Sequence, residues 1–349
     1  QNKILIKSLL YVRFLIFYYA LRLIIYLKLI NYKLLFLVFG SVSLFVSADL
    51  VIQYFLGYNL FGFEGSGRRL PGIFKNEYIA GSFIQRFSFF AIFYILLFSI
   101  FKNKVKFTLV LLFMLILILV SLVFAGNRIP LIMFIFGLTL IMLFKKEVRK
   151  IFIFLLITVP LSLFFLLKSN NEIHSHYVGF FIKTDQIFDY YSNKAKGNDP
   201  VQNNNYIKEI ESGFATWGLN KYLGGGIKSF YNNCIKLDKE IAKKWGAGDF
   251  KVNNCPNHPH NYHVQILAEL GLVGYLLFLS LFIYIFVKGL KLQKYNSIEK
   301  ELITPFLIIL FIELFPIKTT GSFFTTSNST FIFLFLAIIA GIAYKKKIE

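Results

Sequence analysis

The chain has 349 residues, of which 56% are hydrophobic and 43 are Phe, and it carries a formal net charge of +20 at pH 7. Few soluble globular domains of this length could bury so much apolar surface, so the composition excludes an ordinary soluble protein. The Lys and Arg residues stand between long apolar runs, which is typical of membrane proteins and argues against nucleic acid as a partner.

Apolar runs that can cross a bilayer recur along the chain. A spanning helix needs about 20 mainly apolar residues. Runs that reach or approach this length lie at 34–56, 78–101, 107–125, 129–144, 151–167, 263–287, 302–316 and 328–344. The sequence therefore predicts an all-α integral membrane protein, a helical bundle with about eight or nine spans and one large loop.

The segment 4–30 is apolar too, but Lys7, Arg13, Arg22 and Lys28 interrupt it. It is either a ninth span or a helix that lies in the membrane interface. Because the first residue is Gln1 and not Met, we expect an N-terminal truncation or a processed start.

The short connections between the runs carry clusters of basic residues, and all of these clusters fall on one side if the eight spans alternate. They lie at 28–33, 102–106, 145–150, 288–294 and 345–347. Short basic connections stay in the cytoplasm. The other connections, including 57–77, 168–262 and 317–327, are therefore expected to face the periplasm or the cell exterior.

The longest outward segment differs in composition from the rest of the chain, because Asn, Lys, Asp and Gly become common and long apolar runs stop. The chain thus divides into N-terminal spans at 1–167, a large loop at 168–262 and C-terminal spans at 263–349. A long loop without structure of its own is uncommon, so local helices are expected within it. We place them at about 177–192, 203–217 and 234–245.

A glycine-rich turn, Gly224-Gly225-Gly226, precedes Lys228 in this loop. A nucleotide-binding P-loop needs Gly directly before the Lys, and Ile227 stands there. Two alternatives remain. Either the backbone N–H groups approach an anionic substrate together with Lys228, or the segment is a plain tight turn.

The chain has two cysteines, Cys234 and Cys255, and both lie in the outward loop. In an oxidising compartment such a pair is expected to form a disulfide, the alternative being two unpaired small residues. Closing the loop would stabilise the fold by about 3 kcal/mol in the chain-entropy model.

Polar residues are densest at 255–263, where His258, His260 and His263 follow Cys255. Such a cluster could hold zinc. However, Cys255 has an expected disulfide partner, a proline separates the first two His residues, and the cluster contains no carboxylate, so we expect no metal.

Asn261 is a good N-cap for the apolar helix that follows. The simplest interpretation of this segment is therefore a helix start. The local dipole also keeps an imidazole beside a helix N-terminus neutral, so His260 is placed to act as a base. We take His258 and Asn261 as candidate substrate-binding residues.

Several ionisable residues lie inside or at the ends of apolar runs, namely Asp49, Arg86, Glu269 and Glu313. Such residues are costly in hydrocarbon and are functional candidates by default, whereas a snorkelling side chain is the structural alternative. We take Glu269 as a candidate substrate-binding residue.

A basic rim is predicted on the outward side. Arg128 lies in a very short turn, and Arg68, Arg69 and Lys75 lie in the first outward connection. These residues suit a lipid-linked diphosphate, and attraction to anionic headgroups is the alternative explanation.

Four motifs together resemble a known family. They are Arg69-Leu70-Pro71-Gly72, Ala125-Gly126-Asn127-Arg128, Leu223-Gly224-Gly225-Gly226, and His260-Asn261 followed after nine residues by Gly271-Leu272-Val273-Gly274. Their order and predicted topology are similar to those of the bacterial O-antigen ligase superfamily, which includes O-antigen polymerase-like proteins.

The resemblance implies an inverting glycosyltransferase of the bacterial inner membrane with a periplasmic active site. Such an enzyme transfers a glycan from undecaprenyl diphosphate to a sugar hydroxyl, usually on the lipid A core, without ATP, metal or other cofactor. By matching position, His260 would deprotonate the acceptor and Arg128 would bind the diphosphate.

One departure concerns a second arginine that the family's ligases usually carry shortly before a Trp. The stretch before Trp217 has none, and Lys208 or Lys228 lacks the planar fork of arginine. A polymerase of the same superfamily is therefore an alternative, with a polysaccharide or lipid transporter as the alternative from another class.

Overall fold

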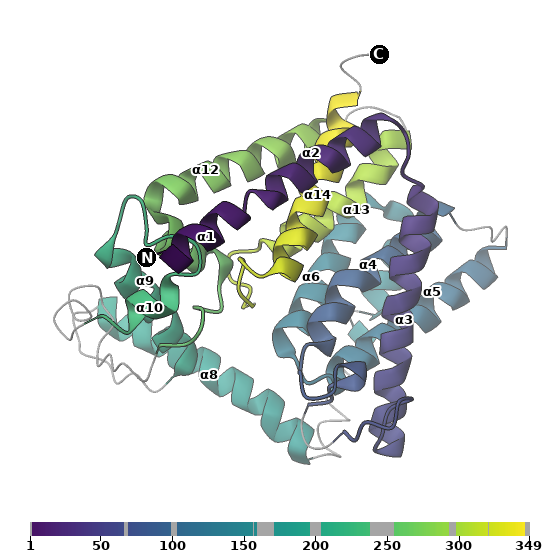
Figure 1. The fold of residues 1–349 in the computed structure, drawn as a ribbon. Coiled ribbons are helices and arrows are strands. Elements are labelled where there is room, and N and C mark those ends of the chain that lie inside the picture. The colour runs from purple at the N-terminus through teal and green to yellow at the C-terminus, as the bar shows by residue number, and fades with distance from the viewer. Residues whose placement is uncertain are drawn as a thin grey trace. The chain divides into compact units, whose positions relative to one another are not determined.

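The computed structural model describes residues 2–65, 69–98, 103–155, 157–158, 171–195, 204–237, 255–292, 298–319 and 321–345. Every regular element in these residues is helical apart from one isolated β-bridge, between Tyr58 and Glu64. The predicted all-α membrane fold is confirmed (Figure 1).

Six helices in the described residues are long and apolar enough to cross a membrane. They are Leu5–Tyr26, Tyr32–Leu56, Ala80–Phe98, Lys104–Phe124, Tyr262–Leu292 and Thr326–Ala343. The predicted spans 129–144 and 302–316 correspond to shorter helices, α6 (Arg128–Phe144) and α13 (Ile298–Glu313). Most of the predicted span 151–167 lies outside the described residues.

The chain divides into two compact units that alternate along the sequence, so neither unit is one continuous stretch. The first contains residues 1–28, 182–295 and 314–349, and the second contains residues 29–181 and 296–313. The division into 1–167, 168–262 and 263–349 stays a prediction.

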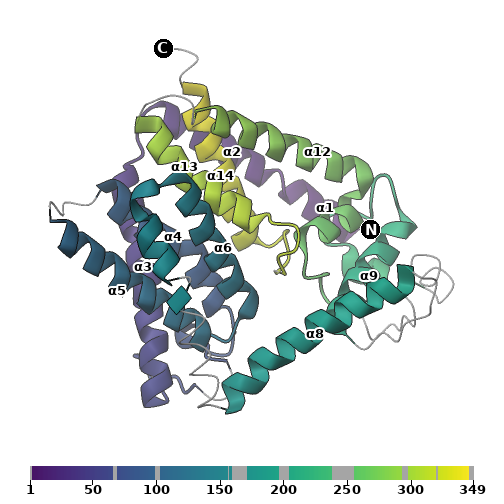
Figure 2. The same ribbon diagram turned by 180° about the vertical axis from the view of Figure 1, so that it is seen from behind.

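The second unit contains α3 (Tyr32–Leu56), α4 (Ala80–Phe98), α5 (Lys104–Phe124), α6 and α13, with short 3-10 turns η1 (Gly72–Phe74) and η2 (Lys146–Val148). Helix α4 packs against α3, α5, α6 and α13, and Figure 2 shows α4, α6 and α13 from behind. Gly40 lets α3 approach α4 closely, since a Cβ there would lie 2.8 Å from the Ala91 backbone. Small residues serve this purpose between membrane helices.

The first unit contains α1 (Asn2–Leu10), α2 (Arg13–Tyr26), α9 (Asn205–Leu219), α10 (Phe230–Cys234), α12 (Tyr262–Leu292) and α14 (Thr326–Lys345), with the C-terminal part of α8 (Asn171–Ala195). Helix α2 lies beside α14 (Figure 1). Arg13 donates to Thr326 at 2.8 Å, and Gly341 lies against Ile25. The two helices therefore run parallel over most of their length. This packing favours a spanning helix over an interfacial helix for the predicted segment 4–30.

The loop helices differ in part from those expected. Helix α8 covers the predicted segment 177–192, and helix α9 begins two residues after the start of the predicted segment 203–217. Helix α10 ends at Cys234, where the sequence predicts a helix to begin, and residues 238–254 lie outside the described part.

Candidate functional site

The segment from Cys255 to Asn261 forms the turn that leads into α12. Asn261 caps the helix as expected, because its Oδ1 accepts from the Val264 N–H at 3.1 Å. Its Nδ2 donates to the Pro316 carbonyl at 2.6 Å. The amide thus fixes the start of α12 against the segment that follows Leu314.

His260 stands directly before this cap in an uncommon conformation. Its φ is +45°, in the left-handed region that non-glycine residues rarely occupy. Such conformations persist only where surrounding structure enforces them, and they cluster at functional sites. The side chain remains 43% exposed, so the ring is accessible to a substrate.

Two side chains contact His260. Its Nε2 lies 4.0 Å from Oε1 of Glu209 on α9. The ring of His258 lies beside the His260 imidazole, with a centroid distance of 4.2 Å and an interplanar angle of 51°. The cluster of His260, Glu209 and His258 is called the His260 cluster below.

His258 differs from His260 in its surroundings. Burial, and to a lesser extent the charge of His260, lowers the pKa of His258 to about 4. Its Nε2 is buried without a hydrogen-bond partner. His258 is therefore a neutral aromatic partner at neutral pH.

His263 is used for structure. Its Nε2 lies 2.8 Å from the Leu314 carbonyl, and its Nδ1 lies 3.2 Å from the Tyr275 hydroxyl. Both ring nitrogens of His263 therefore have partners within the protein, whereas the side chain of His260 is 43% exposed.

Helix α9 packs tightly against the turn that carries His260. A Cβ on Gly213 would collide with Val264 and lie 3.3 Å from Pro259. Glu209 is four residues before Gly213, so it lies on the same face of α9. Glu209 was not among the residues predicted from the sequence, because its spacing from Gly213 gives the face of α9 but not what that face contacts.

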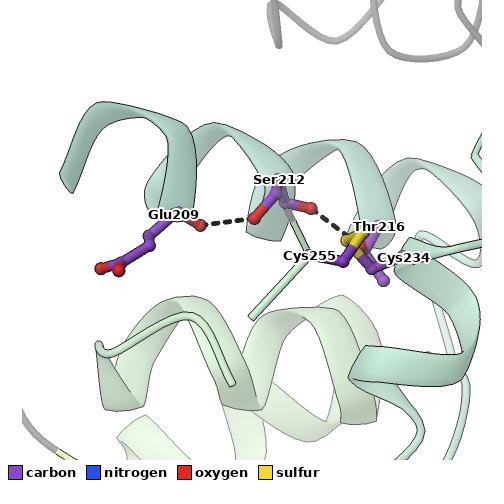
Figure 3. The surroundings of a disulfide bond; sticks show 5 residues. All are labelled: Glu209, Ser212, Thr216, Cys234 and Cys255. Atoms are coloured by element: carbon purple, nitrogen blue, oxygen red, sulfur yellow. Dashed lines mark hydrogen bonds between the residues drawn. A yellow bond between two sulfur atoms is a disulfide. The ribbon is translucent and has the colours of Figure 1, made fainter. Parts of the chain in front are cut away.

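The structure joins Cys234 and Cys255 in a disulfide, which ties α10 to the beginning of the His260 turn. Figure 3 shows the bond beside Thr216 of α9, with Glu209 about two turns earlier on the same helix. Cys234 lies in a small core with Ala215, Phe230 and Ala268. Because Cys255 is bonded, its thiolate is not available to a metal.

The glycine-rich turn packs against α12. The Gly226 N–H donates to the Glu269 carbonyl at 2.8 Å, and the Lys228 N–H donates to the Glu269 carboxylate. The Lys228 side chain is exposed. These backbone donors are directed at the protein's own acceptors, which favours the plain-turn interpretation.

Glu269 is buried, with 1% exposure, and it lies inside the fold. Gln265 donates to its Oε1 at 3.0 Å, and the Lys228 N–H donates to its other oxygen. This arrangement gives Glu269 a structural task, which is to hold the glycine-rich turn on α12. A substrate contact for Glu269 stays a prediction.

Gly271 interrupts α12 just beyond Glu269. Its φ is +67°, and a Cβ there would lie 2.5 Å from the Gly224 nitrogen, so only glycine fits without strain. The N–H groups released by the kink find other acceptors. Leu272 donates to the Lys221 carbonyl at 2.8 Å, and Val273 donates to the Tyr222 carbonyl at 3.1 Å.

Arg128 belongs to the second unit and is the first residue of α6. Its guanidinium lies 5.4 Å from the centre of the Phe180 ring. The preceding Asn127 donates to the Tyr78 carbonyl at 2.9 Å, which ties this turn to the start of α4. Arg128 is therefore held at the N-terminal end of the apolar helix α6.

The structure describes one of the two arginines predicted in the first outward connection, Arg69. Arg69 also belongs to the second unit, and its Nε is buried without a hydrogen-bond partner. Arg68 lies outside the described residues. The structure thus gathers Glu209, His258 and Asn261 around His260 in the first unit, whereas Arg128 and Arg69 belong to the second.

The charged residues predicted within apolar runs of the second unit have partners inside the protein. Arg86 binds Glu313 through two hydrogen bonds of 3.0 and 2.5 Å. Asp49 accepts from the Leu60 N–H at 3.0 Å and from Asn59 at 3.3 Å. These contacts show how each charge is accommodated, namely by pairing within the bundle.

Comparison with known proteins gives one family. Residues 113–279 match the family model described as O-Antigen ligase. The matched region runs from α5 into α12 and contains Arg128, Glu209, both cysteines and His260. A search of curated proteins finds no match.

The match agrees with the resemblance of the sequence motifs and with the all-α membrane fold. Family members are membrane enzymes of the ligase and polymerase type, and they act on lipid-linked glycans. The match over residues 113–279 therefore supports membership of the O-antigen ligase superfamily.

Proposed function

We propose that this protein is an inverting glycosyltransferase that transfers a glycan from undecaprenyl diphosphate to the hydroxyl of an acceptor sugar on the lipid A core. The reaction takes place at the periplasmic face of the bacterial inner membrane and uses neither ATP nor a metal. The observation that carries the proposal is His260, an exposed imidazole held in a left-handed conformation at the start of α12, within the region that matches the family.

The proposed step begins at the acceptor. His260 removes the proton of the sugar hydroxyl, and the oxygen attacks the anomeric carbon of the donor from the face opposite the diphosphate. The bond between that carbon and the phosphate oxygen breaks, and its electron pair leaves with the diphosphate. A positioned base contributes about 10²- to 10⁴-fold to such a reaction.

The diphosphate needs positive charge as it leaves. Arg128 is the residue proposed to bind it, and Arg68, Arg69 and Lys228 are further candidates. A guanidinium offers a planar pair of donors that matches phosphate, and it is most effective where water is scarce. Because both substrates are anchored in the bilayer, their encounter is confined to one plane, which favours proximity.

Reconstitution tests the reaction. Purified protein in liposomes is incubated with an undecaprenyl-diphosphate-linked glycan and lipid A-core, and the products are separated by size. Product on the core is expected. A longer lipid-linked glycan would instead indicate a polymerase, and the absence of both products would contradict the proposal.

His260→Ala is expected to abolish transfer while the protein remains folded, because the acceptor then has no base. His263→Ala is the matched control, because it removes an imidazole three residues later, in the first turn of α12. It is expected to lower the melting temperature and to keep turnover per folded molecule, since His263 serves structure. Wild-type turnover in His260→Ala would show that the base assignment is wrong.

Arg128→Ala tests the donor side in the same assay. Loss of a charge-assisted hydrogen bond of about 1.5–3 kcal/mol predicts a drop of about 10- to 100-fold in kcat/KM for the donor. Arg128→Lys is expected to recover part of it, because lysine keeps the charge but not the planar fork. An unchanged kcat/KM in Arg128→Ala would contradict this role.

A further inference from the structure

Glu209 is a carboxylate beside the proposed base, and the proposed function does not yet use it. Its Oε1 lies 4.0 Å from Nε2 of His260, and its side chain is 23% exposed. The ring of His258 contacts the same imidazole at a centroid distance of 4.2 Å. His260 is thus held between a carboxylate and a second aromatic ring.

The backbone fixes this arrangement from several directions within the first unit. Gly213 allows α9 to press against Val264 and Pro259, which flank His260 in sequence. The disulfide between Cys234 and Cys255 holds the other end of the turn. Glu209 and His260 therefore face each other because two packed backbones set their separation.

Among the ionisable residues near His260, Glu209 is the carboxylate that faces the imidazole. Burial raises the pKa of Glu209, and the neighbouring His260 opposes that rise. Glu211, two residues further along α9, is engaged elsewhere, with Tyr190 at 2.6 Å and Lys194 at 2.7 Å. His258 is neutral near pH 7, and on α12 His263 is bound to Leu314 and Tyr275.

We propose that Glu209 is a positioning residue for His260: its carboxylate holds the Nε2 edge of the imidazole toward α9 and stabilises the imidazolium that forms during transfer. This inference rests on the proposed function. It adds a Glu–His pair to a site in which the family resemblance supplies the imidazole alone.

The proton balance of the pair is simple. With Nε2 facing Glu209, the opposite nitrogen, Nδ1, takes the proton from the acceptor hydroxyl. The ring then carries a positive charge beside an ionised carboxylate, and the neutral His258 ring lies next to it at a tilt of 51°. When the imidazolium later releases its proton to water, the pair returns to its starting state.

The first test is the pH dependence of transfer in Glu209→Gln, measured in the reconstituted assay with whichever product the wild-type protein forms. Glutamine keeps the shape but removes the charge, so the base becomes weaker. We expect kcat to fall about tenfold or more with little change in the acceptor KM, and the acidic limb of the profile to move toward lower pH. Glu209→Asp is expected to restore part of kcat.

Glu211→Gln is the matched control, because it makes the same chemical change on the same helix. It is expected to lower the melting temperature through its contacts with Tyr190 and Lys194 and to leave the acidic limb in place. A Glu209→Gln protein with the wild-type limb and kcat would overturn the proposal. So would an equal displacement of the limb in both variants.

A second measurement needs no turnover. The ring of His260 is followed by NMR in isotope-labelled protein in detergent, with His260→Ala used to assign its signal. The ring signals of His260 are expected to move in Glu209→Gln and to keep their wild-type positions in Glu211→Gln. Unchanged His260 signals in Glu209→Gln would contradict the pairing even if the variant were inactive.

The two proposals fail in different ways. If His260→Ala keeps its turnover, the proposed base is wrong. If His260→Ala is inactive while Glu209→Gln keeps both the wild-type pH profile and the wild-type His260 signals, the glycosyltransferase proposal stands and the Glu–His pair alone is wrong.

Discussion

Arg86 and Glu313 illustrate how single residues make charge tolerable inside apolar helices. The side chains are 16% and 1% exposed, and the guanidinium makes two hydrogen bonds to the carboxylate. A buried ion pair gains little relative to an apolar pair of similar size, but removing one partner leaves the other charge buried and uncompensated.

At the residue scale, we therefore predict that Glu313→Ala destabilises the protein by about 3–5 kcal/mol, whereas the double variant Arg86→Met with Glu313→Met recovers most of that loss. Thermal unfolding in detergent measures both. Glu301→Ala is the control, because Glu301 pairs with Lys145 at a side-chain exposure of 45% and should cost at most about 1 kcal/mol. Equal losses in the two single variants would contradict the prediction.

At the scale of elements, α9, α10 and the start of α12 form one supporting structure for the His260 cluster. The disulfide joins α10 to the turn, and Ala215 of α9 and Ala268 of α12 pack in the same core. The kink at Gly271 adds hydrogen bonds from α12 to Lys221 and Tyr222. The position of His260 thus depends on several elements that are distant in sequence.

We predict that replacing both cysteines with serine lowers stability by about 3 kcal/mol and reduces transfer, because the turn that carries His260 loses a covalent attachment. Reductant should reproduce this effect in the wild-type protein and have no effect on the double-serine variant. Unfolding curves and transfer rates, each measured with and without reductant, provide the comparison. Transfer that is unaffected by both changes would show that the disulfide does not support the site.

At the scale of the whole molecule, the distribution of basic residues predicts how the chain lies in the membrane. The loop with the His260 cluster is expected to be outward, and the connection before α5 is expected to be cytoplasmic. The chain has no free cysteine, so a single added cysteine would be a unique thiol for labelling.

Tyr222→Cys and Lys104→Cys test this orientation, since Tyr222 is 70% exposed and Lys104 is the first residue of α5. A membrane-impermeant maleimide is expected to label the first variant in intact spheroplasts. The second should be labelled only after the membrane is permeabilised. The reverse pattern would place the site in the cytoplasm and exclude a periplasmic transferase.

The sequence by itself determined the membrane class, most of the spanning helices and the cap at Asn261. Hydrophobic length and N-cap chemistry are local properties, so they can be read from a few consecutive residues. His260 was selected in the same way, from its place beside a helix start and from motifs in a fixed order. Its catalytic role remains a proposal.

Only the tertiary structure decided which distant residues meet. Glu209 reaches His260 because Gly213 lets two backbones approach, and Arg86 finds Glu313 across more than two hundred residues. Gly271 is free to adopt many conformations, and its contact with the glycine-rich turn selects the kink. Such pairings depend on packing between elements, and no local pattern in the sequence specifies them.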